Sequence, residues 1–140
     1  MTKSMETATF AEYDQYLSLE FLPDYWYDEA VIIAGQFISK FSANDWTQLA
    51  DSWAGKPVFW KVRCAETLDT DLILAGAAIL TQMLSDVNHE VVLAAVDGLR
   101  SWPRSSITLT DAEITQLTDL HNRSTGIEKL ILSAFLQDRN

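Results

Sequence analysis

The sequence predicts an all-α protein of about six to eight helices, folded as a single domain over residues 1–140. Three observations predict this class. Apolar residues recur with a period near 3.6, and few stretches alternate as β-strands do. Glycine and proline, which interrupt helices, number only five and three. Residues of apolar type make up 48% of the chain, enough for a hydrophobic core without disulfides or metals.

Two helices are predicted in the first 40 residues. The first covers residues 9–21, where Thr9 and Glu12 have the spacing of a capping box. The second follows Pro23 and covers residues 24–40, with a wide apolar face. Its apolar stripe contains Tyr27, Val31, Ala34, Ile38 and Phe41, flanked by Ala30, Ile33 and Phe37. Its opposite, acidic face contains Tyr25, Asp28, Glu29, Ile32 and Gln36.

Three helices are predicted in the middle of the chain. Ser42 can cap a helix that ends near Trp53, before Gly55. Pro57 is suited to be the first residue of the next helix, which extends to about Leu68, because a proline lacks an N–H that would be unpaired there. Residues 71–85 contain the run 72–80, which is apolar on all sides and predicts a central helix.

Three further helices complete the prediction. One covers residues 88–102 and ends at Pro103, and a polar loop follows at residues 104–106. Two capping boxes then open the last two helices. They are formed by Thr110 with Glu113 and by Thr125 with Glu128.

An internal repeat is visible at a shift of 31 residues. The shift aligns residues 60–68 with residues 91–99 and matches apolar positions, one acid and a final leucine. A fainter third copy covers residues 127–136. Stacked helical pairs produce such periodicity, although any two amphipathic helices share part of it.

Residues 57–68 and 86–96 resemble HEAT repeats, and the resemblance is clearest over residues 43–102. It implies an α-solenoid, a stack of helical hairpins. The aromatic run is similar to small bacterial HEAT-like immunity proteins of contact-dependent or polymorphic toxin systems. That run comprises Phe41-Ser42, Trp46, Leu49, Trp53 and residues 60–63. This second resemblance implies a cytoplasmic protein that neutralises one cognate toxin, commonly a nuclease, without catalysis. Such families have no invariant binding motif, so no contact residue is transferred.

The charge of the chain limits its partners. A net charge of −10 repels nucleic acid and anionic membranes, so neither is expected as a direct partner. Residues 4–39 hold seven acids and no lysine or arginine, which suits a basic protein partner. The N-terminus has no apolar stretch after Lys3, and the longest apolar run has nine residues against about 20 needed to span a membrane. The expectation is a soluble, cytoplasmic protein whose single cysteine has no disulfide partner.

Two acidic patches are the predicted partner-binding surfaces. The first contains Asp24, Tyr25, Asp28 and Glu29; the second contains Asp86, Glu90 and Asp97. Carboxylates could pair with lysines and arginines of a basic partner. The alternative is that the acids only solvate the surface, with Trp26 and Tyr27 in the core, Asp86 as a cap and Asp97 paired with Arg100 or Arg104. The sequence leaves open whether Glu90 and Asp97 are concave or convex.

No catalytic, metal or cofactor site is predicted. His89 and His121 lack companions at ligand spacing, and the five glycines are isolated. Trp46, Trp53 and Trp60 fit core packing better than a base-stacking platform. A DNA glycosylase, an activity known on HEAT-like folds, needs a positively charged groove that ten basic among twenty acidic residues do not readily supply.

The leading hypothesis is therefore an immunity protein that occludes the active or substrate-binding surface of a basic toxin, expected to be a nuclease. The alternative is a HEAT-like adaptor or assembly factor with a non-toxin partner. The identity of the toxin and the oligomeric state are open.

Overall fold

The computed structural model describes residues 9–68 and 73–137, and all its regular elements in those ranges are helical, which confirms the all-α prediction. The helices in chain order are α1 (Phe10–Leu17), α2 (Pro23–Tyr25), the π-helical η1 (Trp26–Ala30), α3 (Val31–Ser39), α4 (Ala43–Ser52), the 3₁₀ turn η2 (Trp53–Gly55), α5 (Val58–Thr67), α6 (Leu74–Met83), α7 (His89–Leu99), the 3₁₀ turn η4 (Arg104–Ser106), α8 (Asp111–Arg123) and α9 (Gly126–Gln137).

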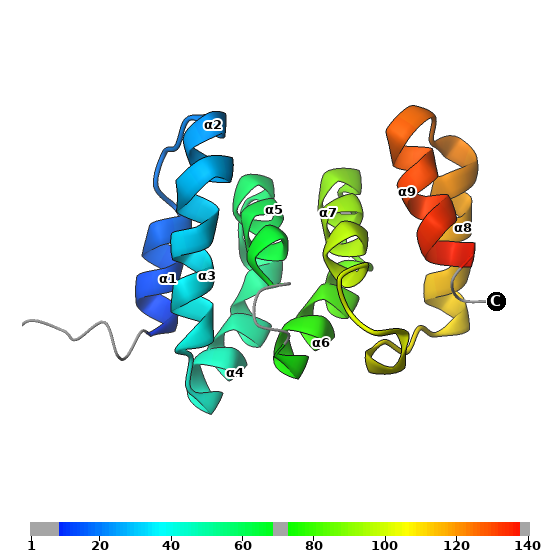
Figure 1. Ribbon diagram of the computed structural model, residues 1–140. Coiled ribbons are helices and arrows are strands. Elements are labelled where there is room, and N and C mark those ends of the chain that lie inside the picture. Colours follow the sequence, from blue (N-terminus) through cyan, green and yellow to red (C-terminus); the bar gives the residue numbers. More distant parts are fainter. Residues whose placement is uncertain (1–8, 69–72, 138–140) are drawn as a thin grey trace, which may run out of the picture.

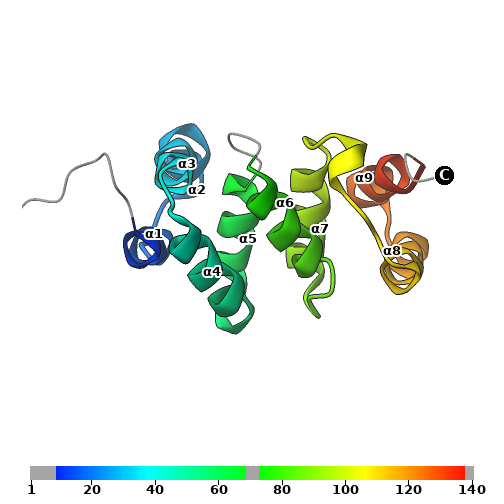
Figure 2. The same cartoon turned by 90° about the horizontal axis from the view of Figure 1, so that it is seen from below.

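Four of these helices stand side by side in one row. Figure 1 shows α3, α5, α7 and α9 following one another across the molecule, with α4 and α6 crossing below them. Helix α5 contacts α3 and α7, and α7 contacts α9. Viewed from below, α1 and α8 lie at the two ends of the row (Figure 2). A HEAT-type solenoid remains a prediction for this arrangement.

Side-chain caps set the starts of several helices. Thr9 with Glu12 and Thr110 with Glu113 form the two capping boxes that the sequence predicts before α1 and α8. Ser42 caps α4 as predicted, and Asp45 completes a third box there. Each box satisfies backbone N–H groups that have no partner within the helix. Helix α1 is shorter than predicted: it ends at Leu17, where the Ser18 hydroxyl donates to the carbonyl of Asp14 at 2.7 Å.

The helical segment after Pro23 differs from the prediction in its phase. Residues 26–30 form a π-helical turn, which contains more residues per turn than an α-helix. The part before it is therefore rotated relative to α3, and Trp26 is buried in place of Tyr27. The prediction that Tyr27 belongs to the apolar stripe is wrong. The remainder of the stripe is buried or partly buried, and the acidic face is exposed as predicted.

The other boundaries lie within a few residues of the prediction. Pro57 is the residue before α5 and not its first residue. Asn88 caps α7, which ends at Leu99, and residues 104–106 form a short 3₁₀ turn where a loop is predicted. The central helix begins at Leu74; residues 71 and 72 of its predicted range lie outside the described residues.

The buried apolar side chains form one hydrophobic core cluster from Phe10 to Phe135. Trp53 and Trp60 are buried in it, and Trp46 packs against it, so the prediction that these tryptophans belong to the core is confirmed. Repeat-related positions of α5 and the segment containing α7 are buried alike. These are Trp60 with Val91, Cys64 with Ala95, and Leu68 with Leu99. The 31-residue shift thus matches helices that pack directly against each other.

The close approach of helix α6 to the backbone at the end of α5 explains why position 76 of α6 is a glycine. A Cβ atom added at Gly76 would lie 2.9 Å from the backbone oxygen of Leu68, so a larger residue would push α6 away from the end of α5. Beside this junction, Cys64 is fully buried, and burial raises the pKa of its thiol to about 12. The Cys64 side chain is therefore a neutral part of the core.

Candidate protein-binding groove

A shallow groove lies between the segment before α3 and the exposed face of α5. We call it the aromatic groove; its lining residues are Phe21, Pro23, Trp26, Tyr27, Phe59, Val62, Arg63, Glu66 and Glu90. Its volume is about 240 Å³, and a second depression of about 450 Å³ adjoins it. The two share Phe21, Phe59 and Arg63, so they form one recessed surface.

Arg63 fixes the wall of the groove. Its guanidinium donates to the carbonyls of Leu17 and Leu19 at 2.8 and 2.6 Å, which ties α5 to the loop after α1. The same group lies 5.1–5.3 Å from the ring centres of Phe21, Trp26 and Phe59. Cation–π attraction of this kind holds a cation without an ion pair. The groove therefore already accommodates one guanidinium among aromatic rings.

Glu66 is the carboxylate of the groove. It accepts a hydrogen bond from the Trp26 indole at 3.1 Å, and the nearby Tyr27 hydroxyl favours its ionised form. Burial raises the pKa of Glu66, and the nearby carboxylate of Asp97 raises it further, while its hydrogen bonds and Arg63 act in the opposite direction. An ionised Glu66 is thus partly desolvated and only partly neutralised.

Two aromatic side chains that line the groove are themselves exposed to solvent. Tyr27 is 60% exposed and Phe59 is 48% exposed. Large exposed rings next to a recess are typical of surfaces that bind another protein, where they act as anchors. The groove therefore combines apolar walls with a negative group, a composition suited to a positively charged ligand.

The first predicted patch is exposed. Asp24, Tyr25, Asp28 and Glu29 all lie on the solvent side of α2 and η1. Tyr25 stacks on Phe21 with ring centres 5.7 Å apart. Together with burial, Tyr25 and Glu29 raise the pKa of Tyr16, so both lie near that residue. The patch therefore lies on the exposed side of the same segment whose Trp26 and Tyr27 line the aromatic groove.

The second predicted patch is divided by the structure. Asp86 is withdrawn from the surface, since its side chain is 5% exposed and pairs with Lys61 at 2.6 Å. It also accepts from the backbone N–H of Asn88 and so starts the turn before α7. Asp97 is exposed and pairs with Arg100 at 3.1 Å. Glu90 lines the aromatic groove, and its carboxylate forms no ion pair with any described residue.

The structure therefore brings Glu90 of the second patch into the groove beside Glu66, and the first patch lies on the helical segment that contributes Trp26 and Tyr27 to the lining. Sequence reasoning missed Tyr27, Phe59 and Glu66 as surface residues of a site. A usable signal was present for Phe59: it lies outside the buried stripe formed by Trp60 and Cys64 of α5 and Leu68 just after it. No local signal indicated Tyr27, because its exposure depends on the π-helical turn.

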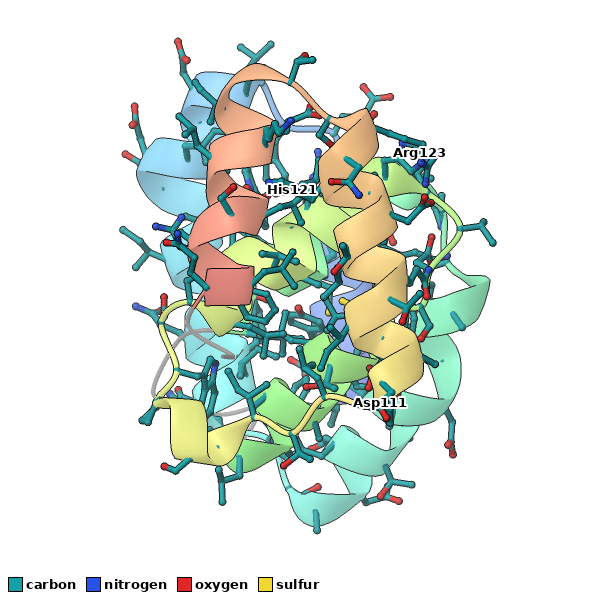
Figure 3. The ribbon with its side chains drawn as sticks, turned by 90° about the vertical axis from the view of Figure 1, so that its right-hand side faces the viewer. Asp111, His121 and Arg123 are labelled. Atoms are coloured by element: carbon teal, nitrogen blue, oxygen red, sulfur yellow. The ribbon has the colours of Figure 1, made fainter. Side chains whose placement is uncertain are left out.

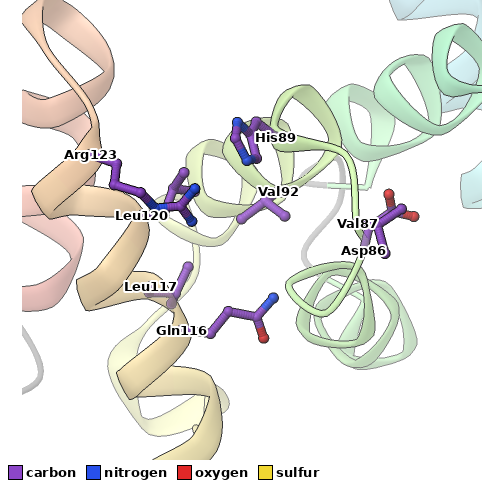
Figure 4. A pocket seen from close by; sticks show the side chains of 8 residues that line it. All are labelled: Asp86, Val87, His89, Val92, Gln116, Leu117, Leu120 and Arg123. Atoms are coloured by element: carbon purple, nitrogen blue, oxygen red, sulfur yellow. The ribbon is translucent and has the colours of Figure 1, made fainter.

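A second, smaller pocket lies between the start of α7 and α8. Figure 4 shows its residues, which are Asp86, Val87, His89, Val92, Gln116, Leu117, Leu120 and Arg123. Its volume is about 120 Å³, half that of the aromatic groove. At the far end of the molecule, His121 bonds to Ser133 at 2.7 Å and Arg123 to Asp119 at 3.0 Å (Figure 3). These side chains are occupied by contacts within the α8–α9 pair.

The part of the chain that the structure describes contains neither a candidate metal site nor a membrane-spanning helix. Residues 9–68 and 73–137 contain no group of three side chains that could hold a metal ion. No helix within these ranges is long and apolar enough to cross a membrane. No family model, curated protein or solved structure matches the chain.

Proposed function

We propose that this protein binds a basic protein partner through the aromatic groove and the first acidic patch, and that the partner is a bacterial toxin that it neutralises. The observation that carries the proposal is the joint exposure of carboxylates and large aromatic rings on one surface. Asp24, Asp28 and Glu29 are exposed on the same helical segment that supplies Tyr27 to the groove, and Tyr27 and Phe59 are exposed in its lining.

The mechanism would be steric and electrostatic. A nuclease binds its substrate mainly through lysines and arginines that contact phosphates. An acidic surface that pairs with those side chains excludes the nucleic acid without any chemistry by the inhibitor. Opposite net charges would also accelerate the encounter of the two proteins.

The restriction to a toxin rests on the resemblance to HEAT-like immunity proteins. An adaptor that binds a non-toxin protein would use the same surface. Co-expression with the product of the gene immediately upstream separates the two, with growth and complex formation as readouts. Rescue of growth together with a co-purifying complex would support immunity. A complex without toxicity would favour the adaptor, and absence of both would contradict the proposal for that pair.

A charge-reversal variant tests which surface is used. Changing Asp28, Glu29, Glu90 and Asp97 to lysine is expected to abolish rescue, because repulsion replaces attraction across the interface. The matched control changes Asp51, Asp111, Asp119 and Glu128 to lysine, which alters net charge equally at exposed positions elsewhere. Circular dichroism verifies that both variants are folded. Equal rescue by the two variants would place the interface on another surface.

A further inference from the structure

We propose that the aromatic groove binds an arginine side chain of the partner, with the guanidinium held between Tyr27 and Phe59 and paired with Glu66 and Glu90. This inference rests on the proposed function for the identity of the partner, but not for the chemistry of the ligand. The proposed function requires only attraction between an acidic and a basic surface, whereas this inference specifies one arginine side chain bound in the aromatic groove.

Charge favours a cation in this recess. Glu66 and Glu90 contribute two carboxylates to the lining, whereas Arg63 contributes one positive group. The Arg63 guanidinium is already engaged by two backbone carbonyls and three rings. A carboxylate has about four acceptor positions, so Glu66 retains capacity beyond its bond from Trp26 and its interaction with the nearby Tyr27. A second cation could therefore pair with Glu66 without displacing an existing contact.

Shape favours arginine over lysine. The exposed rings of Tyr27 and Phe59 provide flat apolar surfaces on the groove. A guanidinium is planar, stacks on aromatic rings and is more weakly hydrated than an ammonium, so it loses less on entering a recess of this kind. Arg63 already places one guanidinium against these rings, 5.1 Å from the ring centres of Phe21 and Phe59.

Burial of Glu66 makes the pairing selective for a charged ligand. The partly desolvated carboxylate lacks the full hydration of a surface acid, and its raised pKa reflects that loss. A guanidinium placed beside it would restore favourable interaction in surroundings that screen charge less than bulk water does. A neutral ligand of the same shape would not.

The test uses the full chain and three small probes. They are acetyl-Gly-Arg-Gly-amide, its lysine counterpart and its citrulline counterpart, which keeps the shape of arginine without the charge. The readout is the NMR signal of the Trp26 indole N–H, whose donor bond to Glu66 lies in the groove. The arginine peptide is expected to shift this signal saturably, and the citrulline peptide is not. Lysine is expected to bind about two- to fivefold more weakly than arginine.

Two variants locate the interaction. Glu66→Gln with Glu90→Gln keeps an acceptor for Trp26 and removes both charges, so affinity for the arginine peptide is expected to fall about tenfold. The control combines Asp111→Asn and Glu128→Gln, two exposed acids on α8 and α9; Figure 3 labels Asp111. Its affinity should equal that of the unchanged protein. Equal shifts by arginine and citrulline, or unchanged affinity in the double glutamine variant, would overturn the inference.

The outcome is distinguishable from that of the proposed function. If the Glu66 and Glu90 amide variant still binds and neutralises the toxin, while the charge reversal described above does not, the function stands and arginine binding in the groove is wrong. If the peptide binds selectively but no toxin is found, the groove chemistry stands and the immunity proposal fails.

Discussion

The helices before residue 68 and those after residue 73 are held together by different kinds of contact. In the first region, polar bonds cross between helices within the core. Asp45 accepts from the backbone of Phe10 at 3.0 Å, the Tyr13 and Thr67 hydroxyls bond at 2.6 Å, and the Trp60 indole donates to Asp14 at 2.9 Å. The close aromatic pairs of the described residues also lie in this region.

The second region packs mainly through aliphatic side chains. Leu117, Leu120, Leu132 and Phe135 are its buried residues on α8 and α9. Among the described residues, the bond between His121 and Ser133 is the polar side-chain contact that joins these two helices. Directional bonds therefore position the aromatic groove, whereas the other end of the row depends on apolar volume. Positions that must hold a ligand need the first kind of packing.

The largest effect is expected for Trp60→Ala. This side chain is fully buried, and its loss removes a large apolar group and the donor to Asp14. We expect the free energy of unfolding to fall by about 3–5 kcal/mol in urea titrations. Leu132→Ala is the matched truncation in the second region, with a loss toward the lower end of about 2–5 kcal/mol. A larger loss for Leu132→Ala would contradict the comparison.

A smaller effect is expected where a polar contact between helices is removed. Asp45 is 6% exposed, and its replacement by alanine leaves the Phe10 N–H without this acceptor. The expected loss is about 1–3 kcal/mol, with faster amide hydrogen exchange at Phe10. Ser133→Ala, which removes the half-buried bond to His121, should cost less than about 1 kcal/mol. Equal losses would mean that the two regions do not differ in this respect.

The smallest effect is a change in pH dependence at the groove. Burial raises the pKa of Glu66 above the ordinary value of 4.5. The groups that also shift this pKa are Trp26 and Tyr27 of η1, Arg63 of α5 and Asp97 of α7. The folded protein therefore holds the Glu66 proton more tightly than the unfolded chain does. This contribution to the free energy of unfolding is fully present below pH 4.5 and is lost as the pH rises through the folded-state pKa.

Glu66→Gln removes this dependence while keeping an acceptor for the Trp26 indole. Its melting temperature should match that of the unchanged protein below pH 4.5 and exceed it modestly above the folded pKa. Thermal melts across acidic and neutral pH measure the difference. A difference that is constant with pH would show that the carboxylate carries no burial penalty.

The helical class and most helix boundaries could be predicted because they depend on local chemistry. Thr9, Ser42 and Thr110 cap helices with their own side chains, and Pro23 opens α2 one residue before the predicted helix start. The exposure of Tyr27 could not be predicted, because the π-helical turn leaves no mark in apolar periodicity; it buries Trp26, whose indole donates to Glu66 of α5, and leaves Tyr27 exposed.

The candidate site was predictable only in part for the same reason. Asp24, Asp28 and Glu29 could be assigned to an exposed face from helical spacing alone. The union of Glu66, Glu90 and Tyr27 in one groove requires contacts between residues far apart in sequence. Asp86 shows the opposite case. The sequence suggests that it could bind a partner, but in the fold it forms an ion pair with Lys61, 25 positions away.

The state of Cys64 has a practical consequence for labelling this protein. Thiol reagents attack the thiolate, and a buried thiol with a pKa of about 12 presents only about one part in 100,000 as thiolate at pH 7. Because the single cysteine of the chain is fully buried, we expect no thiol of the folded natural sequence to react. Cysteines introduced on the rim of the groove could thus carry fluorophores or spin labels while the core remains unchanged.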